Sequence, residues 1–253
     1  MFNAEKEVNN IVKYIQDYYK KCNLKGVVLG ISGGKDSGVV AALFVKALGA
    51  ENVLGVTLPC HSQATDKSDA QLVADKYGFE LLNIDLTGVY DNFIEQIDKI
   101  GNFTEEELKN SNINIKPRFR MASVYYLAAL YSALKGGTYI VAGTGNKCEL
   151  YVGYFTKGGD STFDIGVIND YTVDEVIALG EYLEVPGPVL HKAPSDGLSG
   201  QTDEDKLGVK YKDIAAYMEG KEVDPESKKK IEKLHAAAGH KFNIPLYIRE
   251  NEK

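Results

Sequence analysis

The stretch VVLGISGGKDS at residues 27–37, followed by VVAALFVKAL at 39–48, decides the fold of this chain. The apolar run at 27–31 is typical of a buried strand, and the run at 39–48 of a helix that Gly49 ends. A helix start offers free backbone N–H groups and a positive dipole end to an anion. Gly33 and Gly34 lack a Cβ, so the backbone can approach phosphate oxygens closely. The stretch therefore predicts a phosphate-binding loop between a strand and a helix.

The spacing within this loop excludes two common nucleotide motifs. Gly30 and Gly34 are one residue too close for G-x-x-x-x-G-K-[ST], and Asp36 follows Lys35 where that motif has Ser or Thr. G-x-G-x-x-G is not matched either. A carboxylate inside a phosphate loop is explained if Asp36 holds Mg²⁺ against the phosphates. The alternative, a strand–helix turn of small residues without a ligand, fits this order of residues less well.

Strand and helix patterns alternate along the chain. This predicts an α/β fold, a doubly wound, mostly parallel five-stranded sheet with helices on both faces, in a single domain over residues 1–253. The expected strands are 27–31, 53–58, 80–85, 138–143 and 163–168. The expected helices are 4–21, 39–48, 65–77, 88–100, a short helix capped by Thr104 and Glu107, 118–135, and one from Asp170 or Thr172 to 183.

The C-terminal part of the sequence predicts a helical extension. Residues 186–205 are rich in Pro, Gly, Ser and Asp, which indicates a structureless lid or binding loop. Two helices are expected after it. The last has Asp224 as its N-cap, Pro225 at its first position and Gly239 past its end.

Composition narrows the classes of function. The net charge of −7 disfavours a nucleic-acid partner, which needs a basic surface. Three cysteines without a C-x-x-C pair indicate a reduced, intracellular chain. The charged first ten residues do not resemble a signal peptide, and apolar runs fall short of the roughly 20 residues that span a bilayer. We expect a cytoplasmic protein without membrane contact.

The loop resembles the SGG-x-DS loop of the ATP pyrophosphatase (PP-loop) superfamily, whose members split ATP into AMP and pyrophosphate. This resemblance implies an adenine nucleotide alpha hydrolase-like fold. It also implies catalytic roles for Lys35, Asp36 and Ser37. The ATP-binding residues that it implies are Gly30, Ile31, Ser32, Gly33, Gly34, Lys35, Asp36 and Ser37.

Two further stretches, IKPRFRMASVYYLA (115–128) and VAGTGNKCELYVGYFTKGGDSTFDI (141–165), resemble ammonia-dependent NAD synthetases. With the loop and a late His-Lys pair, the resemblance spans most of residues 1–245. It implies ATP contacts from Thr144 and Ser195, and a Mg²⁺ site formed by Asp36 and Glu149. It implies that deamido-NAD is bound by Arg118, Lys157, Asp164, His240 and Lys241.

The activity implied by this resemblance is C–N bond formation. ATP would adenylate the carboxylate of deamido-NAD, and ammonia would displace AMP to give NAD, in NAD biosynthesis. ATP is then a co-substrate, Mg²⁺ the cofactor and a homodimer the expected assembly. Asp160 or Asp164 is a possible base for ammonium. The chain has no room for a glutaminase domain, so ammonia would arrive free or from a separate subunit.

One position departs from the family pattern. Many members carry an ATP-contacting Lys where this chain has Val173, and Lys192 or Lys206 is the expected substitute. In isolation, Arg118 and Glu149 each fit a solvated surface role better. Two other functions stay open: another PP-loop enzyme, such as a GMP synthetase ATPase or a tRNA thiolase, and a non-catalytic nucleotide sensor.

Overall fold

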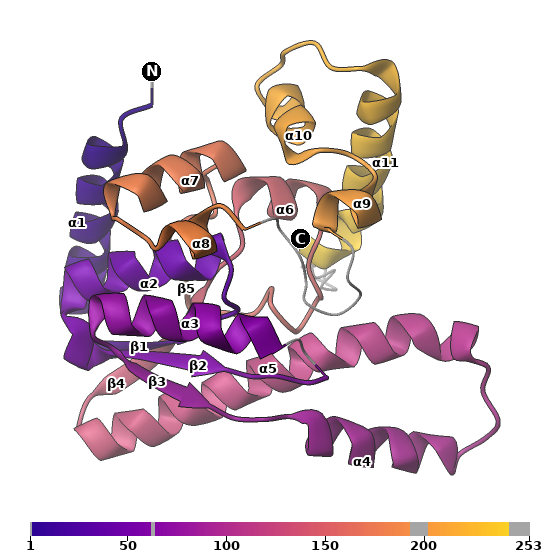
Figure 1. The fold of residues 1–253 in the computed structure, drawn as a ribbon, viewed down its shortest axis with the longest axis horizontal. Helices are drawn as coiled ribbons and strands as arrows, with labels where there is room; N and C mark the ends of the chain where they lie inside the picture. The colour runs from indigo at the N-terminus through magenta and orange to yellow at the C-terminus, as the bar shows by residue number, and fades with distance from the viewer. Residues whose placement is uncertain (1, 62–63, 193–201, 243–253) are drawn as a thin grey trace, which may run out of the picture.

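A parallel sheet with helices on both faces organises the chain, as predicted (Figure 1). The computed structural model describes residues 2–61, 64–192 and 202–242. The strands are β1 Leu24–Gly30, β2 Val53–Thr57, β3 Glu80–Asn83, β4 Thr138–Gly143 and β5 Ile165–Gly166. The helices are α1 Ala4–Cys22, α2 Lys35–Leu48, α3 Ala64–Tyr77, α4 Thr87–Asp98, α5 Glu105–Lys135, α6 Lys147–Val152, α7 Val173–Tyr182, α8 Gly187–Leu190, α9 Asp203–Leu207, α10 Tyr211–Met218 and α11 Pro225–Phe242, with a 3-10 turn, η1, at Ala50–Asn52.

The strand order is β3-β2-β1-β4-β5, and every neighbouring pair is parallel. In the central strand β1, Val28 pairs with Leu54 of β2, and Val27 pairs with Ile140 of β4. The chain moves outward from β1 through β2 and β3, and then returns to β4 on the other side. The carboxyl ends of β1 and β4 therefore flank the switch point where open α/β sheets bind ligands.

Helices bury both faces of the sheet. Figure 1 shows α1, α2, α3, α7 and α8 on one side and the long α5, with α4 beside it, on the other. Successive residues of β1 point to opposite faces, so Leu29 joins the first core layer with Phe44, whereas Val28 joins the second with Leu127 and Val141. Burial on both faces explains why β1 and β2 read as continuous apolar runs.

The predicted helical extension at the C-terminal end is confirmed. Helices α10 and α11 pack against α6, and Leu207 of α9 shares a buried core with α6 (Figure 1). Together they enclose a third, smaller core whose buried members are Cys148, Val152, Leu207, Val209, Tyr211, Ile214 and Ile231. The extension therefore lies directly on the helix that follows β4 at the switch point.

The prediction of two helices between 104 and 135 is wrong, because α5 runs without a break over 31 residues. It begins at the expected capping box of Thr104 and Glu107 and passes through Pro117. Pro117 removes one helical hydrogen bond, but tertiary contacts hold the helix on both sides of it. Thr156 donates to Asn114 at 3.0 Å, and Arg118 donates to the Lys157 carbonyl.

Other element ends also differ from prediction. Helix α11 continues through Gly239, which was expected past its end, because His240 and Lys241 in its last turn form hydrogen bonds with the loop that follows α6. Helices α8 and α9 occupy the two ends of the stretch 186–205 that was expected to be structureless.

Helix α2 begins at Lys35 and not near 39, and β5 is only two residues long. Among the helices in the described part of the chain, none is long and apolar enough to cross a membrane.

Candidate active site at the carboxyl edge of the sheet

The loop between β1 and α2 is compact and open to solvent on one side. Gly33 has φ 79°, a left-handed conformation that favours glycine. Ser37 Oγ donates to the Gly34 carbonyl at 3.0 Å, and the Ser32 N–H donates to Ser37 Oγ at 3.2 Å. The two serine hydroxyls are 3.1 Å apart, and Ser32 is exposed. The loop thus presents the N-terminus of the 14-residue helix α2 toward the switch point.

Asn146 joins the loop to α6. Its side-chain N–H donates to Asp36 Oδ1 at 3.3 Å, and its backbone N–H donates to Glu149 Oε2 at 3.1 Å. Asn146 is fully buried and also caps α6, since its side-chain oxygen accepts from the backbone N–H groups of Cys148 and Glu149. The carboxylates of the two predicted Mg²⁺ ligands therefore both accept hydrogen bonds from Asn146, one from its side chain and one from its backbone. Sequence reasoning missed Asn146, although the N-x-x-E capping pattern at 146–149 could have found it.

Charges at this point are close together and poorly hydrated. Burial and the charge of Asp36 raise the pKa of Glu149 to about 8, although the hydrogen bond from the Asn146 N–H and the charge of Lys35 oppose the shift. Burial disfavours the charge on Lys35, but Asp36, Glu149 and Asp203 outweigh it, so its pKa is raised. Lys35 Nζ lies 3.0 Å from Asp36 Oδ2 and is 5% exposed. One buried ammonium thus faces several carboxylates.

This donor set fits Mg²⁺ that is completed by phosphate oxygens. Carboxylate oxygens are hard ligands. Glu149 has a raised pKa in the ligand-free protein, and a bound cation would stabilise its ionised form. Within the described residues, no group of three or more His, Cys, Asp or Glu side chains could hold a metal ion. Mg²⁺ commonly binds through one or two carboxylates plus substrate phosphates. Asp36 and Glu149 match that arrangement.

Two further side chains reach this site from the C-terminal extension. Asp203, at the start of α9, is 7% exposed and accepts a hydrogen bond from the Tyr154 hydroxyl at 3.0 Å. Tyr211 is 3% exposed, and its buried hydroxyl lacks a hydrogen-bond partner in the structure's described part. Burial, followed by the charges of Glu149 and Asp203, raises the pKa of Tyr211. Sequence reasoning missed both, because only the packing of α9 and α10 on α6 brings them here.

A second group of predicted residues meets beside the end of α6. Arg118 of α5 donates through Nε and Nη2 to the Lys157 carbonyl at 3.3 and 3.2 Å. Lys157 Nζ donates to the His240 carbonyl at 2.6 Å. Lys241, next to His240, donates to two carbonyls of the loop that follows α6. Four of the five residues predicted to bind deamido-NAD thus lie in one contact network.

The fifth, Asp164, lies beside β4. It accepts hydrogen bonds from the Val141 N–H at 2.8 Å and the Tyr125 hydroxyl at 3.1 Å. Burial and the charge of Asp164 raise the pKa of Tyr125 to about 12. Asp160 is exposed, and its carboxylate accepts from the Thr156 N–H at 2.8 Å. Thr144 is half-buried directly after β4, at the switch point.

Position 173, where many family members carry an ATP-contacting Lys, has a packing role in this structure. Val173 begins α7 and packs against the core formed by α6 and the C-terminal helices. Lys192, one expected substitute, forms an ion pair with Asp69 of α3 at 2.7 Å. Lys206, the other, lies in α9. Ser195 falls outside the described residues.

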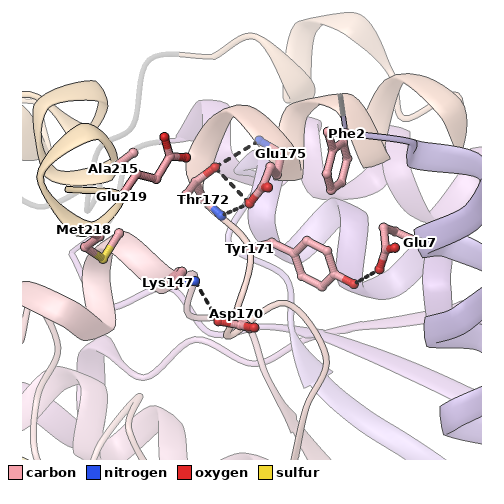
Figure 2. A pocket seen from close by; sticks show the side chains of 10 residues that line it. All are labelled: Phe2, Glu7, Lys147, Asp170, Tyr171, Thr172, Glu175, Ala215, Met218 and Glu219. Carbon is pink, nitrogen blue, oxygen red and sulfur yellow. Dashed lines mark hydrogen bonds and ion pairs between the residues drawn. The ribbon is translucent and has the colours of Figure 1, made fainter. Parts of the chain in front are cut away.

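A pocket of about 370 Å³ behind the start of α6 has a different character (Figure 2). Figure 2 shows its polar side chains joined to one another: Lys147 pairs with Asp170 at 2.8 Å, and Tyr171 donates to Glu7 at 2.8 Å. The Tyr171 carbonyl accepts from the Lys147 N–H at 2.9 Å. These contacts support the first turn of α6 from outside, so we place the reactive groups on its other side.

The sequence matches known proteins along nearly its whole length. The family model described as NAD synthase matches residues 7–245. The NH(3)-dependent NAD(+) synthetase of Carboxydothermus hydrogenoformans is 36% identical over 96% of this chain and 97% of that protein. The enzyme of the same name from Methanococcus aeolicus is 42% identical over 83% and 80%.

Solved structures agree with the sequence comparisons. The NMN synthetase of Francisella tularensis superposes with a TM-score of 0.89 at 34% identity, covering 99% of this chain and all of that one. The NH3-dependent NAD synthetase of Campylobacter jejuni, solved with a nitrate ion, gives 0.78 at 28%, covering 98% and 100%. From the match over residues 7–245 and these relatives, the chain belongs to the NAD synthase family.

Proposed function

We propose that the groups around Asn146 are the active site in which this chain, an ATP-using C–N ligase of NAD biosynthesis, amidates deamido-NAD with ammonia. The observation that carries the proposal is the pair of hydrogen bonds from Asn146 to Asp36 and Glu149. They place two carboxylates beside the phosphate loop at the switch point. The cationic network of Arg118 and Lys157 lies at the far end of α6 from them.

ATP would lie across the carboxyl ends of β1 and β4. We assign its phosphates to the loop residues 30–37, where α2 offers N–H groups and Lys35 offers a buried charge. Thr144, at the end of β4, and Ser195 are the other proposed contacts. Bound Mg²⁺, held by Asp36 and Glu149, would supply charge neutralisation on the departing pyrophosphate. Asp36, Lys35 and Ser37 therefore act by positioning and electrostatics.

The chemistry needs no protein nucleophile. The nicotinate carboxylate attacks the α-phosphorus of ATP, the bond to the β-phosphate oxygen breaks, and an acyl-adenylate and pyrophosphate form. Ammonia then attacks the acyl carbon and displaces AMP, leaving the amide. Arg118 and Lys157 are suited to hold the anionic dinucleotide, with His240 and Lys241 beside them and Asp164, next to β4, as a further contact. Asp160 or Asp164 would take the proton from ammonium.

The test is release of AMP and pyrophosphate from ATP with Mg²⁺ and ammonium, with and without deamido-NAD. AMP that depends on deamido-NAD and equals the NAD formed supports the proposal, and Asp36→Ala should abolish it. AMP without that dependence indicates another PP-loop reaction. ATP binding without turnover under any condition indicates a nucleotide sensor.

A second substrate is favoured by one observation. The structural relative with a TM-score of 0.89 is an NMN synthetase, an enzyme named for a mononucleotide. Nicotinate mononucleotide presents the same carboxylate as deamido-NAD but lacks the adenylyl half. The proposal for this chain is therefore tested by direct competition between equal amounts of the two acids, with the two amide products separated. A product ratio in favour of NMN would move the assignment to the mononucleotide.

An apolar pocket beside Arg118 gives that competition a structural probe. The pocket, about 410 Å³, lies between α4 and α5 and includes Phe93, Ile97 and Phe103. If the second base of the dinucleotide uses it, Ile97→Arg raises KM for deamido-NAD and leaves KM for the mononucleotide unchanged. An equal change in KM for deamido-NAD and for nicotinate mononucleotide would show that the pocket does not bind the second base.

We propose that the enzyme acts as a homodimer and that residues 1–253 form one domain. The outer side of α5 leaves Tyr126 70% exposed and Leu134 67% exposed, and α4 leaves Val89 53% exposed. With Leu130, Tyr126 and Leu134 follow one face of α5 at intervals of four residues, and all three are exposed. Exposed apolar side chains on one helical face favour a partner surface. Sedimentation should show a dimer, and Leu134→Asp should shift it toward monomer, whereas the exposed Lys229→Asp on α11 should not. A monomeric wild-type enzyme would contradict the proposal.

A further inference from the structure

We infer that the last turn of α11 positions the loop at residues 153–161, here named the substrate loop, and that Lys241 is the positioning residue. The loop follows α6 and carries Lys157 and Asp160. The inference rests on the proposed function only in assigning this loop to deamido-NAD. The positioning itself is a property of the ligand-free protein.

The first observation is that α11 packs closely against the end of α6. Gly153 ends α6 in a left-handed conformation, φ 69°, and a Cβ there would overlap Ala238 of α11, which is 3% exposed. One turn earlier, a ring nitrogen of His235 lies 2.7 Å from the Tyr151 carbonyl, and the two rings stack at 4.3 Å. Glycine at 153 is therefore required both by its backbone angle and by the neighbouring helix.

The second step is the ammonium of Lys241. Nζ donates to the Gly153 carbonyl at 2.7 Å and to the Phe155 carbonyl at 2.6 Å, and it lies 5.0 Å from the centre of the Phe155 ring. An ammonium has three donors. Two of them hold the loop backbone, which leaves one for an anionic substrate. Burial lowers the pKa of Lys241, whereas the charge of Asp160 opposes that shift.

The third step is the reverse contact from the loop to the helix. Lys157 Nζ donates to the His240 carbonyl, one of the last carbonyls of α11, which lack intrahelical partners. A cation at a helix C-terminus is also favoured by the helix dipole. From the opposite side, Arg118 of α5 donates to the Lys157 carbonyl. The substrate loop is thus clamped between α5 and α11 at three of its residues.

A loop fixed in this way lowers the entropic cost of ordering the residues that meet the substrate. Loss of the clamp should therefore weaken deamido-NAD binding and leave ATP binding unchanged, because the phosphate loop is held by other contacts. A purely structural role would instead lower the amount of folded enzyme and leave both KM values unchanged.

The experiment compares Lys241→Met, Lys241→Arg and the exposed control Lys233→Met. Amide hydrogen exchange is followed in residues 153–161 of the ligand-free enzyme, and KM is measured for both substrates. Two hydrogen bonds to a charged donor are lost in Lys241→Met, so we expect exchange to accelerate about tenfold or more. KM for deamido-NAD should rise about tenfold, with KM for ATP within about twofold. Lys241→Arg should restore part of both, since a guanidinium can also donate to two carbonyls.

A second pair of variants tests the packing of Ala238 against Gly153 while the Lys241 ammonium is kept. Ala238→Val should accelerate exchange in the substrate loop, whereas Ala237→Val, on the exposed side of the same turn, should not. Unchanged exchange in both Lys241→Met and Ala238→Val would overturn the inference, even if KM rises. Accelerated exchange in an enzyme that does not use deamido-NAD would support the clamp and reject the proposed substrate.

Discussion

The side-chain amide of Asn146 donates a hydrogen bond to Asp36 across 110 residues of sequence, at 3.3 Å. This contact joins the loop after β1 to the first turn of α6, the helix after β4. The same residue caps that helix and donates through its backbone to Glu149. The relative position of the two carboxylates therefore depends on one buried side chain.

Replacing Asn146 by Ala should therefore affect both stability and activity. Loss of the cap should cost about 1–2 kcal/mol in the free energy of unfolding. Because Asp36 also loses its partner, kcat/KM for ATP should fall at least about tenfold, as measured by initial rates and urea unfolding. Asn3→Ala removes an equivalent Asn cap from α1, away from the proposed site, so it should destabilise the protein by a similar amount and leave kcat/KM for ATP unchanged. The same kcat/KM in both variants would show that Asn146 has no role in the active site.

Stability should depend on pH through Glu149. The pKa of Glu149 is about 8 in the folded state and about 4.3 in the unfolded state. At a pH between these two values, the folded protein therefore binds more protons than the unfolded chain. This stabilisation is complete below about pH 4.3 and is lost as the pH rises through about 8. Without Mg²⁺ and ATP, the Tm of the wild type should fall between pH 5 and 9 by several degrees more than that of Glu149→Gln. At this chain length, each kcal/mol corresponds to about 2–4 °C. Parallel curves would show that Glu149 does not titrate there.

Tyr211→Phe should stabilise the ligand-free protein. Its hydroxyl is buried without a partner in the described structure, and removing such a group recovers a desolvation penalty of about 1 kcal/mol. Tyr139→Phe is the matched control, because its hydroxyl is also buried and unpaired but lies under α5. Urea midpoints should rise for both. Only Tyr211→Phe should change kcat if its hydroxyl contacts the reacting groups, and unchanged kcat in both variants would leave it a packing residue.

Gly33→Ala should weaken ATP binding. The residue adopts φ 79°, so a side chain strains the loop by about 1 kcal/mol or more, and the backbone must shift to relieve it. We expect Kd for ATP to rise at least about fivefold in calorimetric titrations. Gly88→Ala lies within α4, where a Cβ meets open space, so it should leave ATP affinity unchanged and slightly stabilise the protein. Normal affinity in Gly33→Ala would show that the loop geometry is not required.

The sequence was informative wherever structure depends on neighbours along the chain. The order of apolar strands, glycines and helix caps predicted the parallel sheet, the tight loop between β1 and α2, and the start of α5 at Thr104. Element ends were predicted less well. Pro117 and Gly239 usually stop helices, yet both lie inside helices here, because contacts from distant residues hold the backbone on either side.

The sequence by itself determined that a loop of the form SGGKDS follows the central strand, since backbone conformation and helix capping depend on adjacent residues. Only the tertiary structure decided which distant groups meet that loop. Asn146 reaches Asp36 because β4 lies beside β1, and Asp203 and Tyr211 approach Glu149 because α9 and α10 pack on α6. Such contacts depend on the burial of whole helix faces, which no local pattern of residues specifies.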